Sequence, residues 1–240
     1  MLGLGILLDR FAGKPAPTAI SLNADTRSNA RTAMNTTPAQ TNARRAPDAP
    51  LASAADTQPD HRHDFDFLHG YWHVAHRKLR SRLSGCTDWE EFESTQQCWP
   101  LLGGICNVDE SRRLGAAVEE LPGAGHIGAS VRCFDLANQH WRIYWVSASD
   151  GLLGMPPVVG GFVDGVGIFE ADEMIGGRIV RVRFTWTVLS PTTAHWQQGF
   201  SLDQGMTWEV NWTMSFTRIA AGEFAQLHAD QSARVNAGRG

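Results

Sequence analysis

The feature that most constrains the fold is a period-two alternation of apolar and polar residues, which recurs in short segments from Phe65 onward. In the clearest segment, residues 208–216, every second residue is apolar and the residues between are Glu, Asn, Thr and Ser. Side chains of a β-strand point alternately to its two faces, whereas a helix would scatter both sets around its axis. The alternation therefore predicts a strand with one apolar face, made by Trp208, Val210, Trp212, Met214 and Phe216.

The same alternation occurs in residues 140–146 and 178–188. Helix signals are limited to Phe65–Gly70, with Asp64 as a candidate N-cap and Gly70 as a candidate stop. Connections are mostly of hairpin length, and closure of a sheet removes its exposed edges. We therefore predict an all-β fold, a single antiparallel up-and-down β-barrel of nine or ten strands with a short N-terminal helical turn. The other strand candidates are residues 71–80, 89–98, 104–110, 129–135, 161–164 and 165–171.

The first 60 residues differ in composition from the rest of the chain. They contain one aromatic residue, Phe11, and no tryptophan, and they are rich in Ala, Pro, Thr, Asp and Asn. Such a segment cannot bury enough apolar surface to offset the conformational entropy lost on folding. We therefore predict a disordered N-terminal segment at residues 1–60, a β-barrel domain at 61–220 and a flexible C-terminal tail at 221–240.

The charge of the chain limits its partners. A formal net charge of −4 and an isoelectric point near 6.1 do not favour nucleic acid or an anionic membrane surface. The apolar run at the N-terminus ends at Asp9 without a basic segment before it, and no stretch approaches the roughly 20 apolar residues of a membrane span. We expect a cytoplasmic protein with a small-molecule partner. A homodimer, and a start at Met34 in place of Met1, are left open.

The segment Ser201–Trp208 fits the pattern Ser-x-Asp-x-Gly-x-Thr-Trp, known as an Asp-box in sialidases and other glycan-active proteins. In this pattern the Asp203 carboxylate accepts bonds from turn N–H groups, Gly205 supplies a positive φ, and Trp208 packs beneath the hairpin. Sialidase propellers repeat the pattern in each blade, whereas this chain has one copy and no repeat of blade length. We interpret the motif as a turn device and not as evidence of a glycosidase.

Four stretches together resemble a bacterial domain family of uncharacterised function: DFDFLHGYWHVAHRKLRSRL, WPLLGGICNVDE, PPVVGGFVDGVGIFEAD and WQQGFSLDQGMTWEVNWTMSFTR. The resemblance runs from about Asp64 to Arg218. Members of that family are predicted to be lipocalin-like, calycin-type barrels, distantly similar to nitrobindin and fatty-acid-binding barrels. Gly70-x-Trp72 is also similar to the Gly-x-Trp of lipocalins, whose Trp packs at the barrel floor. The resemblance implies a closed barrel with a pocket and supplies no reaction.

The candidate binding residues lie on strands that carry Arg or Tyr on one face and Trp on the other. If the polar faces point inward, guanidinium and phenol groups can bind an anion such as a carboxylate. If the Trp faces point inward, the interior is an aromatic box for a flat apolar ligand, and the Arg side chains are solvated. If the Trp side chains only fill the core of the barrel, the interior has no room for a ligand and binds none. The candidate ligand-binding residues are Arg142, Tyr144, Trp145, Arg181, Arg183, Trp186, Glu209 and Asn211.

Histidines near the start of the barrel and four cysteines are the candidate metal ligands. His73 and His76 are three residues apart and so face opposite sides of a strand, and the chain has no Cys-x-x-Cys pair. The similarity to nitrobindin suggests haem, but no residue here matches its axial histidine. We therefore predict no metal and no cofactor, and buried free thiols. The residues concerned are His61, His63, His69, His73, His76, Cys86, Cys98, Cys106 and Cys133.

Several familiar enzyme motifs do not occur in the sequence, including Gly-x-Ser-x-Gly, His-Glu-x-x-His and a phosphate-binding Gly-rich loop before a helix. We predict that the barrel interior binds a small, largely apolar or aromatic molecule. One alternative is an enzyme of cyclase, hydratase or isomerase type that uses the same cavity, because calycin-type barrels also host such enzymes. The other is a protein-interaction module with a filled core. The sequence leaves open whether the protein is an enzyme.

Overall fold

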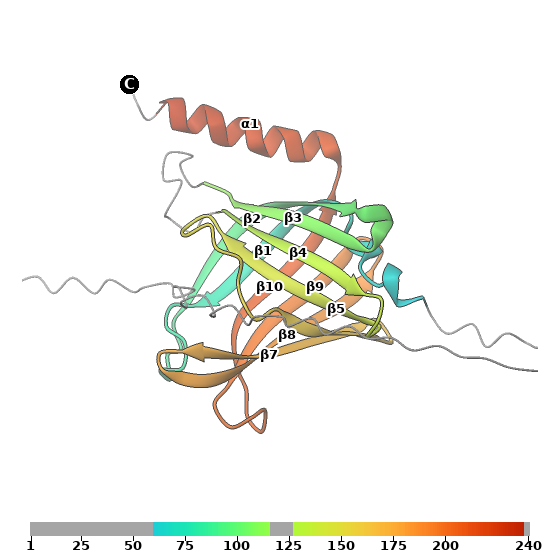
Figure 1. Ribbon diagram of the computed structural model, residues 1–240. Helices are drawn as coiled ribbons and strands as arrows, with labels where there is room; N and C mark the ends of the chain where they lie inside the picture. Colours follow the sequence, from blue (N-terminus) through green and yellow to red (C-terminus); the bar gives the residue numbers. More distant parts are fainter. Residues whose placement is uncertain (1–59, 116–126, 238–240) are drawn as a thin grey trace, which may run out of the picture. The chain divides into compact units, whose positions relative to one another are not determined.

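The computed structural model describes residues 60–115 and 127–237, and the predicted disordered segment lies outside this range except for Asp60. Ten antiparallel strands form one closed barrel (Figure 1), which confirms the predicted all-β barrel. The strands are β1 (Gly70–Leu79), β2 (Trp89–Leu101), β3 (Cys106–Arg113), β4 (Ile127–Asp135), β5 (His140–Ser147), β6 (Val158–Val163), β7 (Val166–Ile175), β8 (Arg178–Ser190), β9 (Thr193–Ser201) and β10 (Glu209–Ile219).

The barrel has up-and-down topology, because each strand pairs with its neighbours in the sequence. The first and last strands close it, with Tyr71 of β1 opposite Ile219 of β10 and Lys78 opposite Trp212. The alternation identifies every strand except β9. In β9 polar residues occupy both faces, since Gln197 and Gln198 are neighbours, and this weakens the period-two signal.

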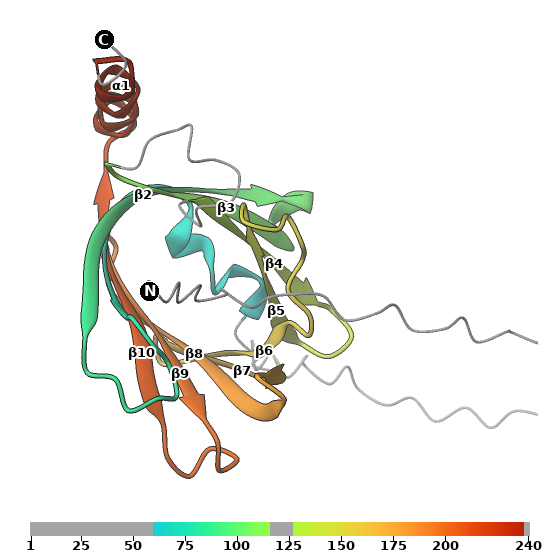
Figure 2. The same cartoon turned by 90° about the vertical axis from the view of Figure 1, so that its left-hand side faces the viewer.

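Two short 3-10 helices, η1 (His61–His63) and η2 (Asp66–Leu68), precede β1 and fill one end of the barrel. Figure 2 shows them inside the ring of strands. Phe65 lies between them and is fully buried, with its ring centre 5.0 Å from that of Phe162 and 5.1 Å from that of Trp141. Edge-to-face packing of this kind makes a tight apolar plug.

The helical segment differs in detail from the predicted single turn. Asp64 does not cap the helical turn that follows it, because the N-cap residue of η2 is Phe65, which makes no side-chain cap bond. Asp60 caps the additional helix η1 by accepting a bond from the Arg62 backbone N–H. The Asp64 carboxylate lies 3.0 Å from Nδ1 of His61 instead. Gly70 has φ +111° and is the first residue of β1, so it turns the chain from the helical segment into the barrel wall.

Trp72 and Arg218 fasten this segment to the first and last strands. The indole N–H of fully buried Trp72 donates to the Leu68 carbonyl at 2.7 Å. The Arg218 guanidinium donates to the carbonyls of His69 and Phe67, and it lies 4.3 Å from the centre of the Trp72 ring. The carbonyl oxygens left at the end of the helical segment are thereby satisfied.

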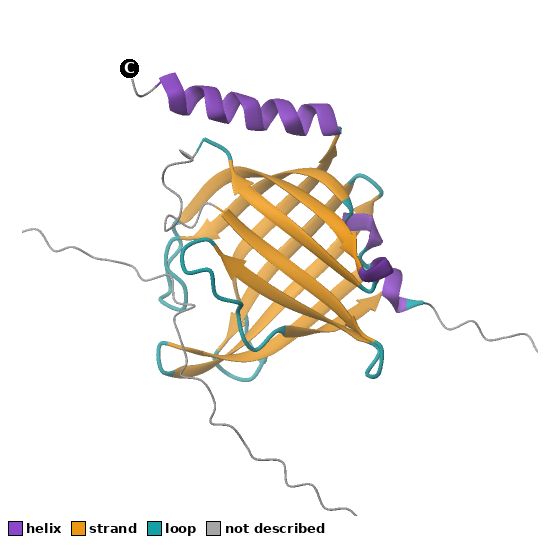
Figure 3. Ribbon diagram, turned by 45° about the horizontal axis from the view of Figure 1, so that its top comes forward, coloured by secondary structure: helices purple, strands orange, loops and turns teal. Residues whose placement is uncertain are grey.

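Residues 221–237, part of the predicted C-terminal tail, form helix α1 (Ala221–Ala237), as Figure 3 shows. The ring of Phe224 lies 4.8 Å from that of Tyr71 on β1. His228 Nε2 lies 2.7 Å from Oγ1 of Thr95 on β2. Phe224 and His228 are four residues apart and so share a helix face, and the Ala-rich composition favours a helix. Contacts with the barrel stabilise a helix that composition alone leaves marginal.

The Trp-bearing strand faces point inward. On β5, Trp141 and Ile143 are buried in the core, whereas Arg142 and Tyr144 alternate with them on the outer face. On β8, the alternate apolar residues Val180, Val182 and Trp186 likewise lie in the core. The barrel therefore has the Trp-bearing strand faces inside and the faces with Arg142 and Tyr144, or Arg181 and Arg183, outside.

A β-bulge in β10 changes part of the predicted apolar face. The register shifts between Val210 and Trp212, so that Asn211 is an extra residue in the strand. Residues from Trp212 onward keep the predicted inward face. Val210 and Trp208 lie outside instead, and the Trp208 ring is covered there by the Arg183 guanidinium at 3.8 Å.

The Asp-box forms the hairpin between β9 and β10. The two oxygens of Asp203 accept bonds from the Thr207 N–H at 2.8 Å and the Thr207 hydroxyl at 2.6 Å. The Ser201 hydroxyl accepts from the Gly205 N–H at 2.8 Å, and the Trp208 indole donates to the Gly205 carbonyl at 2.9 Å. These bonds, above all that from the Thr207 hydroxyl, lower the pKa of Asp203 to about 2. The carboxylate is engaged within the turn, as the turn interpretation requires.

Replacing Gly205 by valine is expected to lower the free energy of unfolding by about 1–3 kcal/mol. Gly205 has φ +95°, and a Cβ there would lie 3.2 Å from the Trp208 ring. Urea unfolding followed by circular dichroism measures the loss. Gly161→Val is the control, because Gly161 has open space at its Cβ position and no positive φ. Equal losses in the two variants would contradict the expected strain at Gly205.

Candidate functional site

The barrel interior contains a cavity of about 270 Å³. It lies away from the helical plug, because none of the plug residues Phe65, Trp72 and Trp141 lines it. The residues of β1 that line it are His76 and Lys78, which are in the second half of that strand. The other lining residues come from β2–β5, β8–β10 and the segments that follow β1 and β5. The cavity therefore opens toward the end of the barrel opposite η1 and η2.

One side of the cavity is aromatic. The Trp212 ring meets that of Trp196 at 5.7 Å and 87°, and that of Trp145 at 6.4 Å and 81°. These edge-to-face contacts hold the rings in fixed positions and leave indole surface toward the cavity. The aromatic residues on this side are Trp145, Phe184, Trp186, Trp196, Trp212 and Phe216.

The position of the Trp145 ring depends on a glycine across the sheet. A Cβ at Gly128 on β4 would lie 2.2 Å from two atoms of the Trp145 ring. Real Cβ atoms do not come that close, so only glycine at this position leaves room for the Trp145 indole against β4. The aromatic side is thus shaped by backbone approach as well as by side-chain packing.

The opposite side of the cavity is polar and contains a buried ion pair. Arg132 of β4 contacts Asp109 of β3, and the two side chains are 3% and 2% exposed. Arg132 also donates to Oδ1 of Asn107 at 3.1 Å, and its guanidinium lies 5.2 Å from the Phe65 ring and 5.7 Å from the Trp186 ring. The charge of each partner is compensated by the other, so the pair adds no net charge to the cavity.

Two buried nitrogen atoms on this polar side have no hydrogen-bond partner among the residues that the structure describes: Nε2 of Gln96 and Nε of Arg132. Gln96 is 5% exposed and lines the cavity next to the ion pair. Burial raises the pKa of the Asp109 carboxyl, and the charge of Arg132 opposes that effect. Buried donors without partners are uncommon in native proteins, so these two atoms require an explanation.

His76 belongs to a hydrogen-bonded chain along the cavity wall. The indole N–H of Trp212 donates to Nδ1 of His76 at 3.2 Å, and Nε2 of His76 lies 2.7 Å from the Ser94 hydroxyl. Since an indole nitrogen is only a donor, Nδ1 accepts and the ring proton is on Nε2, which donates to Ser94. Ser94 also accepts from the Ser111 hydroxyl at 3.0 Å. In this tautomer His76 has no lone pair directed at Ser94 and does not activate that hydroxyl as a nucleophile.

The imidazole of His76 is kept neutral by its surroundings. Burial, and then the positive charges of Lys78 and Arg113, lower the pKa of His76 to about 3. The ring also stacks on Phe92, at 4.4 Å and 10°. At neutral pH this side chain therefore adds no charge to the cavity.

Charged side chains line the outer part of the cavity. Arg113 donates to Oε1 of Glu90 at 2.7 Å, and its guanidinium lies 4.3 Å from the centre of the Phe92 ring. The ammonium of Lys78 lies 4.3 Å from the centre of the Trp212 ring. These contacts hold the basic groups at the rim, so that the interior between the two walls is left to indole rings and neutral polar groups.

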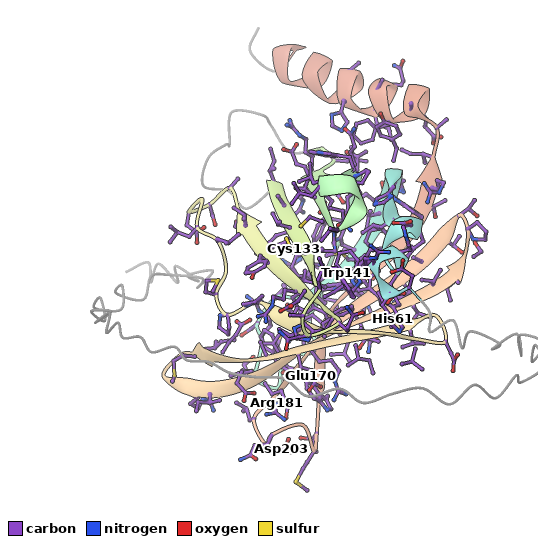
Figure 4. All side chains as sticks on the ribbon, turned by 45° about the vertical axis from the view of Figure 1, so that its right-hand side comes forward. His61, Cys133, Trp141, Glu170, Arg181 and Asp203 are labelled. Carbon is purple, nitrogen blue, oxygen red and sulfur yellow. The ribbon has the colours of Figure 1, made fainter. Side chains whose placement is uncertain are left out.

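Four of the candidate residues lie on the outer face, away from the cavity. Three of them form ion pairs there: Arg142 with Asp135, Arg181 with Asp172, and Arg183 with Glu170. Figure 4 shows Arg181 and Glu170 on the same side of the barrel as the hairpin that carries Asp203. The fourth residue is Tyr144, which alternates with inward-facing Trp145.

The remaining four candidates lie on the inner side or at its edge. Trp145 and Trp186 line the cavity. Asn211 is fully buried at the bulge and accepts a bond from Nε2 of the lining residue Gln198 at 2.8 Å. Both oxygens of Glu209 accept bonds from the Leu83 N–H, at 2.9 and 3.0 Å, so this carboxylate fixes the segment after β1.

Sequence reasoning missed the polar side of the cavity, including Ser94, Gln96, Asp109 and Arg132. These residues occupy alternate positions on β2, β3 and β4. On β2 and β3 both faces carry polar residues, so apolar periodicity does not distinguish inside from outside. In a closed barrel, a strand with polar residues on both faces indicates that part of the interior is polar.

The candidate metal ligands are spread over different environments. Of the five clustered histidines only His76 lines the cavity, and its two ring nitrogens are taken by Trp212 and Ser94, so it offers no lone pair to a haem iron. In residues 60–115 and 127–237 no three His, Cys, Asp or Glu side chains are grouped as metal ligands are. All four thiols are free, with Cys98 and Cys106 buried and the other two half-buried.

Comparisons with known proteins add no relative. The chain matches no protein-family model, and no curated protein is significantly similar to it. The resemblance to lipocalin-like barrels therefore stays a prediction, whereas the closed ten-strand antiparallel barrel is observed. In the described part of the chain, no helix combines the length and the apolar character needed to cross a bilayer.

Proposed function

We propose that this barrel binds a small, largely apolar or aromatic molecule between the two walls of its cavity. The observation that carries the proposal is the cavity itself, lined by four indole rings: Trp145, Trp186, Trp196 and Trp212. Its volume of about 270 Å³ lies just below the range of about 300–1,000 Å³ that is usual for ligand sites. A molecule of one or two fused rings suits such a space.

A protein-interaction module would not need this cavity. A barrel that serves only as a scaffold gains stability from a filled interior, because close packing supplies dispersion contacts that a void lacks. The indole rings of Trp145 and Trp212 instead leave apolar surface facing open space. This arrangement favours small-molecule binding over an interaction module with a filled core.

The enzyme alternative is supported by one observation. Asp109 lines the cavity, and burial raises the pKa of its carboxyl, as in many acid–base catalysts. The same carboxylate contacts Arg132, which holds it as a structural anion. Mass spectrometry of a bound molecule before and after incubation distinguishes the two roles: turnover that is lost in Asp109→Asn with binding retained would favour the enzyme.

Filling the cavity is expected to abolish binding. The first step is native mass spectrometry of the protein purified from its own host, to detect a retained molecule. Calorimetric titration with bicyclic aromatic compounds then gives affinities. Met214→Trp places a larger side chain into the cavity wall and is expected to weaken binding at least tenfold.

The matched control is Ser215→Trp, the same substitution one residue along the strand. Ser215 is exposed on the outer face, so the affinity is expected to be unchanged. Two results would contradict the proposed function. One is the absence of any retained molecule together with no binding across the panel. The other is an affinity that Met214→Trp leaves unaltered in a folded protein.

A further inference from the structure

The polar side of the cavity presents hydrogen-bond donors that lack acceptors. Nε2 of Gln96 and Nε of Arg132 are buried without a partner among the described residues. Both side chains are more than nine-tenths buried, and both line the cavity. The terminal torsion of a glutamine is broad, so Gln96 can turn its amide N–H toward the cavity while keeping its other torsions in their wells.

Ser94 adds a third donor. Its hydroxyl oxygen accepts from His76 Nε2 and from the Ser111 hydroxyl, as the tautomer set by Trp212 requires. Because the Ser94 oxygen accepts both of these bonds, the single proton of its hydroxyl is left to donate to another group. Ser94 lines the cavity on the same strand as Gln96, two residues away and on the same face.

The three donors lie along a diagonal of the inner face of β2–β4, with Ser94 and Arg132 at its two ends. Gln96 and Ser94 are on β2, Arg132 is on β4, and β3 runs between the two strands. Arg132 is opposite Asn107, two residues before Asp109 on β3, and Ser111 is opposite Gln96. The ion pair with Asp109 cancels the charge of Arg132, so the donors form a neutral surface. A neutral donor surface favours an uncharged acceptor over an anion.

We infer that the ligand is a planar, uncharged aromatic molecule whose edge carries hydrogen-bond acceptors, such as an aromatic ketone, lactone or ring nitrogen. Its ring would pack against Trp145 and Trp212, and its acceptor edge would face Ser94 and Gln96, which are neighbours on the inner face of β2. A ligand with a donor edge would leave both of these groups unpaired, and burial of unpaired polar groups is costly. This inference rests on the proposed function and names the chemistry of its ligand.

Three bicyclic probes of similar size test the inference. Chromone has acceptors and no donor, indole has an N–H donor, and naphthalene has neither. Calorimetric titration of the full chain is expected to show that chromone binds at least tenfold more tightly than indole or naphthalene. This ranking needs no variant protein.

Gln96→Leu removes the amide donor with little change in volume. It is expected to weaken chromone binding about tenfold and to leave naphthalene binding unchanged or improved. Gln97→Leu is the matched control, because Gln97 is the next residue on β2 and lies on the outer face. If Gln96→Leu does not fold, Gln96→Met is measured in its place.

The outcomes separate the inference from the proposed function. Comparable affinities for the three probes, or a loss in Gln96→Leu that is the same for chromone and naphthalene, would overturn the acceptor inference and leave the binding function intact. Absence of binding of all three probes at millimolar concentration would overturn both. Preferential binding of chromone that Gln96→Leu removes and Gln97→Leu preserves supports both.

Discussion

Arg132→Met is expected to lower the free energy of unfolding by about 3–5 kcal/mol, the largest loss among the substitutions considered for this protein. Arg132 is the counter-charge of Asp109, and both are almost fully buried. Removing the guanidinium leaves the carboxylate buried without a counter-charge, and it also deprives Asn107 of its donor. Urea unfolding at pH 7 measures the loss.

Replacing both members of the pair is expected to cost less than replacing one. In the double variant Asp109→Leu with Arg132→Met no buried charge is left uncompensated, so a large part of the stability returns. The single variant should also lose less at pH 5 than at pH 7, since an isolated buried carboxyl takes up a proton readily. Arg142→Met is the control, because the pair of Arg142 with Asp135 lies at the surface and its loss should be far smaller. Additive losses in the double variant would contradict the ion-pair account.

Lowering the pH from about 6.5 to 4 is expected to destabilise the protein by about 3 kcal/mol through His76 alone. In the unfolded chain the histidine takes up a proton near its ordinary pKa of 6.5, whereas in the barrel its pKa is about 3. Between these values the unfolded state binds more protons than the folded state, so acid favours unfolding. The stability contributed by neutral His76 is complete above pH 6.5 and is lost as the pH falls toward 3.

The variant His76→Gln isolates this contribution. All other groups titrate alike in the unchanged protein and in the variant. The difference between the free energies of unfolding of the two proteins therefore measures the contribution of His76. At pH 7 the variant should be less stable, because it loses the stacking on Phe92 and the imidazole contacts with Ser94 and Trp212. At pH 4 the difference should vanish or reverse. Stability curves of the two proteins that run parallel from pH 7 to 4 would show that His76 is not a buried neutral histidine.

The resemblance to calycin-type barrels was the main support for closure of the sheet, and the period-two alternation predicted most of the strands. On β5 it separated Trp145 from Arg142 and Tyr144 correctly, because the side-chain direction in a strand depends only on whether positions are odd or even. It left open which of these faces points inward. A sheet can curve toward either face, and the choice depends on how many large apolar side chains all ten strands together enclose.

Deviations from the alternation arose where contacts between distant residues outweigh the local pattern. The bulge at Asn211 moves Val210 and Trp208 to the outer face, and it is held by Gln198 of the neighbouring strand. Helix α1 depends in the same way on contacts of Phe224 with the barrel wall. Neither feature has a period that a sequence window detects.

The sequence by itself determined the fold class, the division of strands such as β5 and β8 into a Trp-bearing and a polar face, and the turn role of Asp203, because strand periodicity and turn chemistry are properties of neighbouring residues. Only the tertiary structure decided the polar wall of the cavity. Gln96, Asp109 and Arg132 are on three different strands, and each is an ordinary polar residue within its own segment. Strand register places them at diagonal positions on three neighbouring strands and closure of the barrel removes them from water, which turns separate side chains into one buried polar wall.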